Sequence, residues 1–226
     1  MIKTCLFDLD GTLLDTLDTI KYYLNRTADK FGLPHVSREE TRIFVGNGAK
    51  NLVARVFEKY GIDTDKPENA ATRDEFFREY VDSYDASPFY LTTPYDGIPE
   101  LVSALRERGI RLAVISNKPD PTVKQLIKDN FGDSFDIVEG AMEGVALKPS
   151  PDAPLSICDR LGVLPSETAY VGDTGTDMKT GRAYGALLNV GVLWGFRDGS
   201  ELVECGATHT VSSPDEILSL IDSYRA

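Results

Sequence analysis

The stretch Cys5-Leu-Phe-Asp-Leu-Asp-Gly-Thr-Leu-Leu14 decides how the chain is interpreted. It is an apolar run that contains two carboxylates, Asp8 and Asp10, separated by one residue and followed by Gly11. Ionised carboxylates are costly to bury without partners, so they do not suit the interior of a strand. At a strand's carboxyl end they could share a metal ion, because ligands of open α/β sheets bind in the crevice beyond those ends. The stretch therefore predicts a strand over residues 4–9 that ends in a functional site.

Length, charge and cysteine content narrow the class of protein. A chain of 226 residues is long enough for one large domain, or for a main domain with a smaller one. The formal net charge of −12 argues against a nucleic-acid surface, which needs clustered lysine and arginine. No apolar run approaches the ~18 residues of a membrane span. Cys5, Cys158 and Cys205 are widely spaced, so we expect reduced thiols in a cytoplasmic protein, with neither nucleic acid nor membrane as a partner.

Short apolar runs alternate with amphipathic helical patterns in much of the chain. The runs predict strands over 111–116, 135–138, 169–172 and 187–193, with a short edge strand over 208–211. The helical spacing predicts helices over 98–108, 119–131 and 152–161. This alternation is typical of an α/β fold, in which a parallel sheet is covered by helices on both faces.

Residues 15–86 break the alternation. Helical patterns cover 17–31, 52–60 and 73–84, and no strand pattern lies between them. We therefore expect a helical cap domain of residues 15–86, inserted after the first strand and lying over the site as a lid. The catalytic core would then comprise residues 1–14 and 87–226.

Polar residues follow four of the predicted strands, at the point where each strand ends. Asp8 and Asp10 follow the first strand, and Ser116, Asn117 and Lys118 follow the second. Lys148 follows the third strand, and the segment Gly172-Asp173-Thr-Gly-Thr-Asp177 follows the fourth. Because a parallel sheet places these ends beside each other, the four segments predict one shared site.

Together these segments resemble the motifs of the haloacid dehalogenase-like superfamily of phosphohydrolases. In chain order they read Asp8-Leu-Asp-Gly-Thr12, Ile115-Ser-Asn117, Lys148-Pro149 and Gly172-Asp173-Thr-Gly-Thr-Asp177. The resemblance covers residues 1 to about 195 and implies a Rossmann-like core with a mobile cap. It also implies Mg²⁺-dependent hydrolysis of a small phosphorylated metabolite, by a monomer or homodimer. Phosphoglycolate phosphatases resemble the chain along much of its length.

The motif residues can be given chemical roles. Asp8 would be the nucleophile that forms an aspartyl-phosphate, which divides one hard step into two. Asp10 would protonate the leaving alkoxide and later deprotonate the attacking water. Ser116 and Lys148 would stabilise the phosphoryl oxygens. We expect Gly11, Thr12 and Asn117 to bind the substrate.

Four aspartates form the predicted Mg²⁺ site. Asp8 and Asp173 would bind the ion with their carboxylates, and Asp10 would bind it with its backbone carbonyl. Asp177 belongs to the same set, although at the start of a helix it would more plausibly orient a metal-bound water or Lys148. Four ionised carboxylates exceed the charge of one Mg²⁺ and Lys148 by one negative unit. Since like charges raise a carboxyl pKa, we expect Asp10 to carry a proton.

One segment of the expected cap is a candidate for reading the leaving group. Arg42-Ile-Phe-Val-Gly-Asn-Gly48 precedes a helix that is predicted to begin near Ala49. The turn formed by Gly46, Asn47 and Gly48 leaves backbone N–H groups unpaired, and a helix N-terminus favours anions. With Arg42 or Lys50, these groups could hold a substrate carboxylate. The alternative is a turn between helices that binds no ligand.

Several other functions compete with a phosphoglycolate phosphatase-like activity. Dehalogenases of this superfamily lack the second aspartate, so Asp10 argues against carbon–halogen chemistry. A phosphonatase would need an activated cap lysine, and nothing marks Lys21, Lys30 or Lys50 as one. A phosphomutase of the β-phosphoglucomutase type stays open, as do phosphatases acting on nucleotides, sugar phosphates or pyrophosphate. A non-catalytic binding protein is a remote alternative, because all four motifs are intact.

Overall fold

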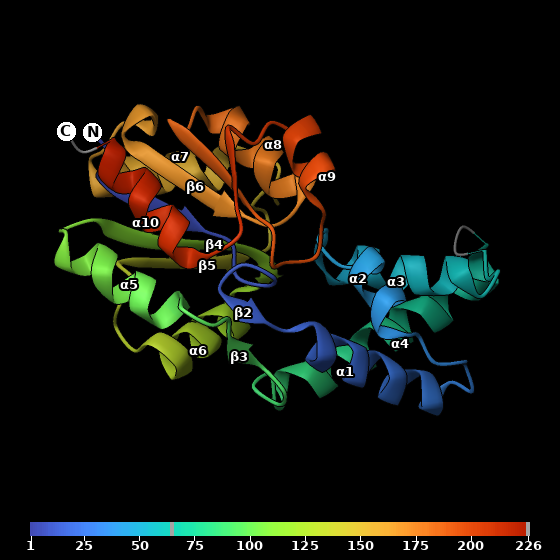
Figure 1. Ribbon diagram of the computed structural model, residues 1–226. Coiled ribbons are helices and arrows are strands. Elements are labelled where there is room, and N and C mark those ends of the chain that lie inside the picture. Colours follow the sequence, from blue (N-terminus) through green and yellow to red (C-terminus); the bar gives the residue numbers. More distant parts are fainter. Residues whose placement is uncertain (64–65, 225–226) are drawn as a thin grey trace. The chain divides into compact units, whose positions relative to one another are not determined.

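A computed structural model describes residues 1–63 and 66–224 of the chain (Figure 1). The chain forms two compact units, Met1–Asp15 with Thr93–Ala226, here called the core, and Thr16–Thr92, here called the helical unit. The sequence predicts a cap of residues 15–86, whereas Asp15 lies in the core and residues 87–92 lie in the helical unit. Residues 64 and 65 of the predicted cap lie outside the described residues.

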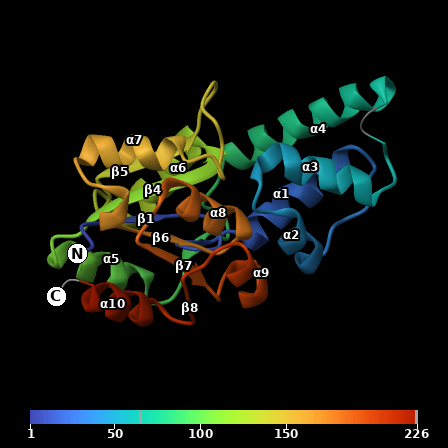
Figure 2. The same ribbon diagram turned by 90° about the horizontal axis from the view of Figure 1, so that it is seen from above.

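The core is built on a parallel sheet. Within the described residues its six strands stand in the order β5-β4-β1-β6-β7-β8 (Figure 2). Their bounds are β1 Thr4–Phe7, β4 Arg111–Pro119, β5 Ile137–Ala141, β6 Thr168–Gly172, β7 Leu188–Val192 and β8 His209–Val211. In the centre, Thr4 of β1 pairs with Arg111 of β4 on one side and with Thr168 of β6 on the other. The chain leaves β1 between these two neighbours, which is where open α/β sheets bind ligands.

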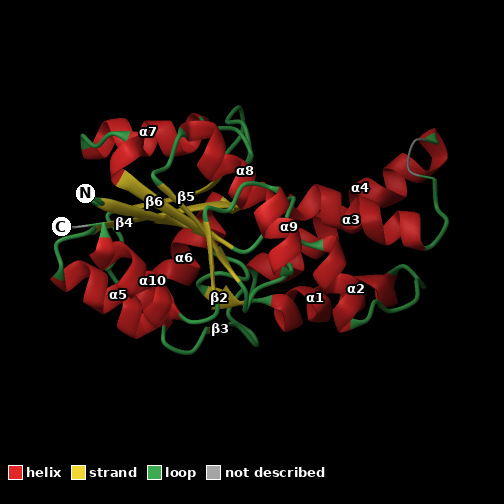
Figure 3. Cartoon of the chain, turned by 45° about the horizontal axis from the view of Figure 1, so that its top comes forward, coloured by secondary structure: helices red, strands yellow, loops and turns green. Residues whose placement is uncertain are grey.

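Helices cover both faces of this sheet (Figure 3). The first face packs against α5 (Ile98–Glu107), α6 (Asp120–Phe131) and α10 (Pro214–Ser223), and the second against α7 (Asp152–Leu161) and α8 (Gly175–Tyr184). Side chains alternate along each strand, so that Cys5 and Phe7 join the first face while Leu6 joins the second. The predicted α/β fold with a doubly covered parallel sheet is confirmed. A short helix, α9 (Gly199–Glu204), lies between β7 and β8.

The boundaries of β4 and β5 differ most from those predicted, and β1 ends at Phe7 rather than at residue 9. The strand expected over 135–138 begins at Ile137, because Phe135 packs edge-on against Phe7 and Phe131 without joining the sheet. β4 continues beyond Ser116 to Pro119, with a shift in its pairing with β5 between Ile115 and Pro119. The core also holds a two-stranded antiparallel pair, β2 (Leu14–Asp15) with β3 (Thr93–Pro94).

The helical unit consists of α1 (Leu17–Lys30), α2 (Arg38–Phe44), α3 (Gly48–Lys59) and α4 (Pro67–Asp85). Aromatic contacts join three of its segments, because Phe76 of α4 packs against Phe57 of α3 and Phe31 at the end of α1. The sequence does not predict α2. That helix has only seven residues, and it begins at a capping box in which Ser37 and Glu40 bond each other's backbone N–H groups.

The predictions of reduced cysteines and of no membrane-spanning segment can be compared with the structure. All three cysteine thiols are free, and those of Cys5 and Cys158 are buried. In the described parts of the chain, no helix is long and apolar enough to cross a membrane.

Candidate active site

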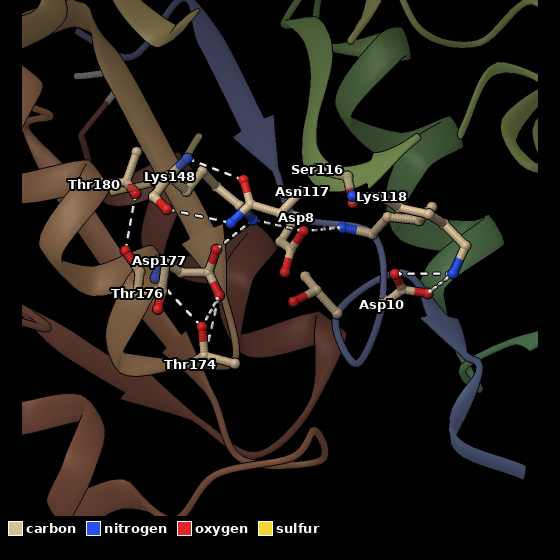
Figure 4. A network of polar contacts seen from close by, with 12 residues as sticks. Asp8, Asp10, Ser116, Asn117, Lys118, Lys148, Thr174, Thr176, Asp177 and Thr180 are labelled. Atoms are coloured by element: carbon tan, nitrogen blue, oxygen red, sulfur yellow. Dashed lines mark hydrogen bonds and ion pairs between the residues drawn. The ribbon is translucent and has the colours of Figure 1, made fainter. Parts of the chain in front are cut away.

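The polar residues predicted from the four motifs gather at the carboxyl ends of β1, β4, β5 and β6 (Figure 4). Lys148, in the loop after β5, lies between two of the carboxylates. Its Nζ is 2.7 Å from Asp8 Oδ1 and 2.7 Å from Asp177 Oδ1. The fold therefore brings together side chains that are more than a hundred residues apart in the sequence.

Asp8, Asp173 and Asp177 form a buried group of carboxylates. Each offers an oxygen, and these oxygens lie within 4.8 Å of one another. Burial is the largest cause that raises the pKa of Asp8, to about 7, and the charge of Asp177 adds to it. Burial also raises the pKa of Asp173 well above its ordinary value, with Asp177 and Asp8 contributing. Three carboxylates around one lysine leave an excess of negative charge, which a divalent cation bound by these oxygens would offset. The donor set fits such an ion.

Lys148 is held in this group by its backbone as well as by its charge. Although burial opposes its ionisation, Asp177 and Asp8 hold the pKa of Lys148 well above its ordinary value. Asn117 accepts from Lys148 N at 2.9 Å and donates through Nδ2 to Lys148 O at 3.2 Å. Both polar atoms of the Asn117 side chain thus serve the lysine loop. The predicted contact of Asn117 with substrate stays a prediction.

Asp173 is oriented by partners from two other segments. Thr12 Oγ1 donates to its Oδ1 at 3.1 Å, and Phe196 N donates to its Oδ2 at 2.7 Å. Gly11, at φ +84°, allows this approach, because a Cβ there would lie 2.2 Å from Asp173 Oδ2. A Cβ at Gly195 would likewise lie 2.3 Å from Asp173 Cβ. The structure thus gives Gly11 and Thr12, which the sequence predicts to bind substrate, direct contact with a predicted metal ligand.

Asp177 is fixed by the first turn of α8. Its Oδ2 accepts from Thr174 N at 3.1 Å and from Thr174 Oγ1 at 2.5 Å, which completes a capping box. Its Oδ1 accepts from Lys148 and from Tyr170 Oη at 3.3 Å. With both oxygens bonded, Asp177 is well placed to orient Lys148. Its role as a metal ligand stays a prediction.

Asp10 contacts a different lysine from Asp8 and Asp177. In the view of Figure 4 it lies on one side of Asp8 while Asp177 lies on the other. Lys118 Nζ contacts Asp10 Oδ1 at 3.0 Å and Oδ2 at 3.2 Å. Ser116, within β4, is buried and accepts from Lys118 N at 3.2 Å. The sequence assigns no role to Lys118, although the unbalanced negative unit in the charge count was a sign that a second cation was missing.

Three further residues that hold the site carboxylates were not predicted from the sequence. The spacing of Thr174 and Asp177 is a capping-box signal that could have identified Thr174. Phe196 and Gly195 follow β7 and reach Asp173 only through the sheet order, so no local pattern indicates them.

The residues predicted to read the leaving group lie in the helical unit. Arg42 donates to Glu39 through Nη2 at 2.6 Å and through Nε at 3.0 Å. Lys50 Nζ lies 6.0 Å from the centre of the Phe77 ring. The helix α3 begins at Gly48, the last residue of the predicted turn, which agrees with a start near Ala49. Binding of substrate by these residues stays a prediction.

Comparison with known proteins defines the class to which this fold and site belong. The family model of haloacid dehalogenase-like hydrolases matches residues 5–189. The chain belongs to this family of hydrolases, as its four motifs predict.

Three similar proteins match nearly the full length of the chain. The N-acetylmuramic acid 6-phosphate phosphatase of Pseudomonas aeruginosa is 31% identical over 98% of this chain and 95% of its own length. The phosphoglycolate phosphatase of Aquifex aeolicus is 30% identical, over 99% and 98%. A crystal structure from Lactobacillus delbrueckii subsp. bulgaricus has a TM-score of 0.90 at 30% identity, over 97% and 98% of the two chains. The similarity extends over nearly the whole chain, including the helical unit.

Replacing Thr12 by valine should weaken the binding of a divalent cation. The substitution keeps the shape of the side chain and removes the hydroxyl that orients Asp173. Loss of such a supporting hydrogen bond typically lowers metal affinity by about 10- to 100-fold. Thermal melting at increasing Mg²⁺ concentration measures the affinity.

Thr4→Val is the matched control, because Thr4 is also a buried core threonine and its hydroxyl forms no hydrogen bond with the described residues. We expect its cation affinity to equal that of the unmodified protein. Equal affinity in Thr12→Val would show that the Asp173 contact does not support the site.

Proposed function

We propose that the protein is a Mg²⁺-dependent phosphatase that hydrolyses a small phosphate monoester through an aspartyl-phosphate on Asp8. The observation that carries this proposal is the position of Asp8, at the end of the central strand β1. Its buried carboxylate contacts Lys148 and lies beside those of Asp173 and Asp177. Membership of the haloacid dehalogenase-like hydrolases and the two phosphatase relatives support it.

In the first half-reaction an Asp8 carboxylate oxygen bonds to phosphorus while the bond to the leaving oxygen breaks. Asp10 gives its proton to that oxygen, so the alcohol leaves neutral. Lys148, and Ser116 through its hydroxyl, stabilise the charge on the phosphoryl oxygens. In the second half-reaction a water oxygen bonds to phosphorus, Asp10 takes the water proton, and the bond to Asp8 breaks. Phosphate is released and both aspartates return to their initial states.

Asp8, Asp173 and the backbone carbonyl of Asp10 would hold Mg²⁺, with Asp177 in support. The bound ion supplies positive charge that offsets the buried carboxylates and the incoming phosphate dianion. Thr12, Phe196 and Thr174 keep the carboxylates oriented, while Asn117 holds the lysine loop.

The two curated relatives also suggest a substrate class. Phosphoglycolate and N-acetylmuramic acid 6-phosphate differ in size, but each carries a carboxylate in addition to its phosphate. We propose that this protein hydrolyses a phosphate monoester whose leaving group bears a carboxylate, with 2-phosphoglycolate as the first candidate. N-Acetylmuramic acid 6-phosphate is the second candidate, because its phosphatase is 31% identical over nearly the full length. A positively charged or N–H-rich segment such as residues 42–50 would suit that carboxylate.

Substitution of the nucleophile tests the mechanism. Asp8→Asn should lower kcat by at least about 10⁴-fold, because an amide does not form the covalent intermediate. The measurement is phosphate release from 4-nitrophenyl phosphate with Mg²⁺ present. Asp133→Asn, at a side chain that is 91% exposed, serves as the control and should retain full activity. Activity in Asp8→Asn comparable to that of the control would contradict the aspartyl-phosphate.

Proton and metal should compete at the site. In the metal-free protein the pKa of Asp8 is raised from 3.8 to about 7. Its contribution to stability is therefore present at low pH and is lost as the pH rises through about 7. Below that pH, Mg²⁺ must displace a proton. We expect Mg²⁺ to raise the melting temperature more at about pH 8 than at about pH 5.5. An equal rise at both pH values would contradict this expectation.

Paired substrates test the substrate class. 2-Phosphoglycolate is compared with 2-hydroxyethyl phosphate, which has a hydroxymethyl group in place of the carboxylate. N-Acetylmuramic acid 6-phosphate is compared with N-acetylglucosamine 6-phosphate, which lacks the lactyl ether that carries the carboxylate. We expect kcat/KM to be at least about 10-fold higher for the carboxylate-bearing member of the better pair, since an unpaired site for an anion disfavours the neutral analogue. Equal or reversed values would refute the substrate class and leave the phosphatase mechanism intact.

A further inference from the structure

Lys118 and Asp10 form an ion pair that the reaction described above leaves without a purpose. Lys118 Nζ contacts both Asp10 oxygens, at 3.0 Å and 3.2 Å. The two side chains are only 9% and 19% exposed, so the pair differs from the solvated pairs on the surface. A charge held at both oxygens restricts rotation of the Asp10 carboxyl group.

The fold builds a specific position for this lysine. Lys118 lies in the part of β4 where the pairing with β5 shifts, and its backbone N–H is bonded to Ser116 Oγ. Gly140 of β5 packs closely on the same segment, since a Cβ there would lie 2.6 Å from Lys118 O. Asp120, which follows Lys118 by two residues, accepts from Gly140 N at 3.1 Å. The strand end that carries Lys118 is thus fixed against β5.

The position of the pair separates the two carboxylates of the first motif. Asp8 contacts Lys148, whereas Asp10 contacts Lys118, so each carboxylate has a lysine of its own. Lys118 lies near the end of β4 and Lys148 in the loop after β5, and these two strands are consecutive on the same side of β1. Asp10 sits in the turn after β1, and the Lys118 contact ties that turn to β4.

We propose that Lys118 is a positioning residue that holds the Asp10 carboxyl group in the orientation required for both proton transfers. The proposal rests on the proposed function, in which Asp10 gives a proton to the leaving oxygen and later takes one from water. Lys118 keeps its own protons throughout and acts through Asp10. Proton transfer needs a separation of about 2.6–3.2 Å between heavy atoms, and a displacement of about 1 Å costs about 100-fold in rate.

The alternative is that Lys118 contacts the substrate directly, through the phosphate or the leaving group. The two roles predict different behaviour when Asp10 is itself substituted. A residue that acts only through Asp10 loses its effect once Asp10 cannot transfer protons, whereas a substrate contact keeps its effect.

The first measurement uses two esters that carry no carboxylate. kcat/KM reports the steps up to the release of the alcohol, and 4-nitrophenolate leaves without a proton whereas 2-hydroxyethoxide does not. Lys118→Met should lower kcat/KM by about 10- to 100-fold for 2-hydroxyethyl phosphate and by less than about 3-fold for 4-nitrophenyl phosphate. Lys118→Arg should recover part of the loss. Equal losses with the two esters would overturn the proposal.

The second measurement is a double-substitution cycle with 2-hydroxyethyl phosphate. Lys118→Met should lower kcat/KM by less than about 3-fold when it is added to Asp10→Asn. A further loss as large as that of the single substitution would assign Lys118 to the substrate and overturn the proposal. Lys128→Met, which removes an exposed lysine paired with Asp133, is the control and should match the unmodified protein. Thermal melting confirms that each variant is folded.

The outcomes separate this proposal from the proposed function. If Asp8→Asn retains activity, the phosphatase mechanism itself fails. If Asp8→Asn is inactive while the double-substitution cycle shows independent effects, only the role of Lys118 fails.

Discussion

The rest of the site depends on the ion pairs that Lys148 makes with two buried carboxylates. Asp8 and Asp177 are almost inaccessible to water, and removing one partner from such a group leaves an uncompensated charge. Lys148 must therefore lie at a fixed point, and Asn117 of β4 holds its backbone from the neighbouring strand end. This requirement couples the loop after β5 to β4 and α8, so the sheet order is what makes the site possible.

The carboxylate of Asp173 is likewise held by groups from other segments of the chain. Asp173 is not held by its own strand but by Thr12 from the turn after β1 and by Phe196 N from the loop after β7. Glycine is needed at positions 11 and 195 because any side chain would occupy the space of the Asp173 carboxyl group. Thr12, which the first motif suggests as a substrate ligand, therefore supports another protein group, the Asp173 carboxylate. This is a common arrangement around sites that concentrate charge.

The sequence predicts the strand ends and the motif residues, because apolar runs, helix periodicity and carboxylates after strands are local signals. It does not predict most contacts between those residues. Thr12 lies 161 residues from Asp173, so their hydrogen bond depends on β1 and β6 being neighbours. Phe135 illustrates the opposite error, since its apolar side chain extends a strand pattern although it packs as a loop residue. The helix α2 is missed because it is short, and only the spacing of Ser37 and Glu40 indicates it.

The contact of Lys118 with Asp10 changes how charge is distributed in the site. Counted from the motifs alone, four aspartates exceed Lys148 and one divalent cation by one negative unit, which a proton on Asp10 was expected to offset. Lys118 supplies that missing positive charge, so the six side chains and the cation together are neutral. This count takes Asp10 as ionised, and with the proton that the proposed first half-reaction needs on Asp10 the set carries one positive unit. The two aspartates of the first motif thus differ because each has its own lysine, and a dianionic phosphate approaches a site without net repulsion.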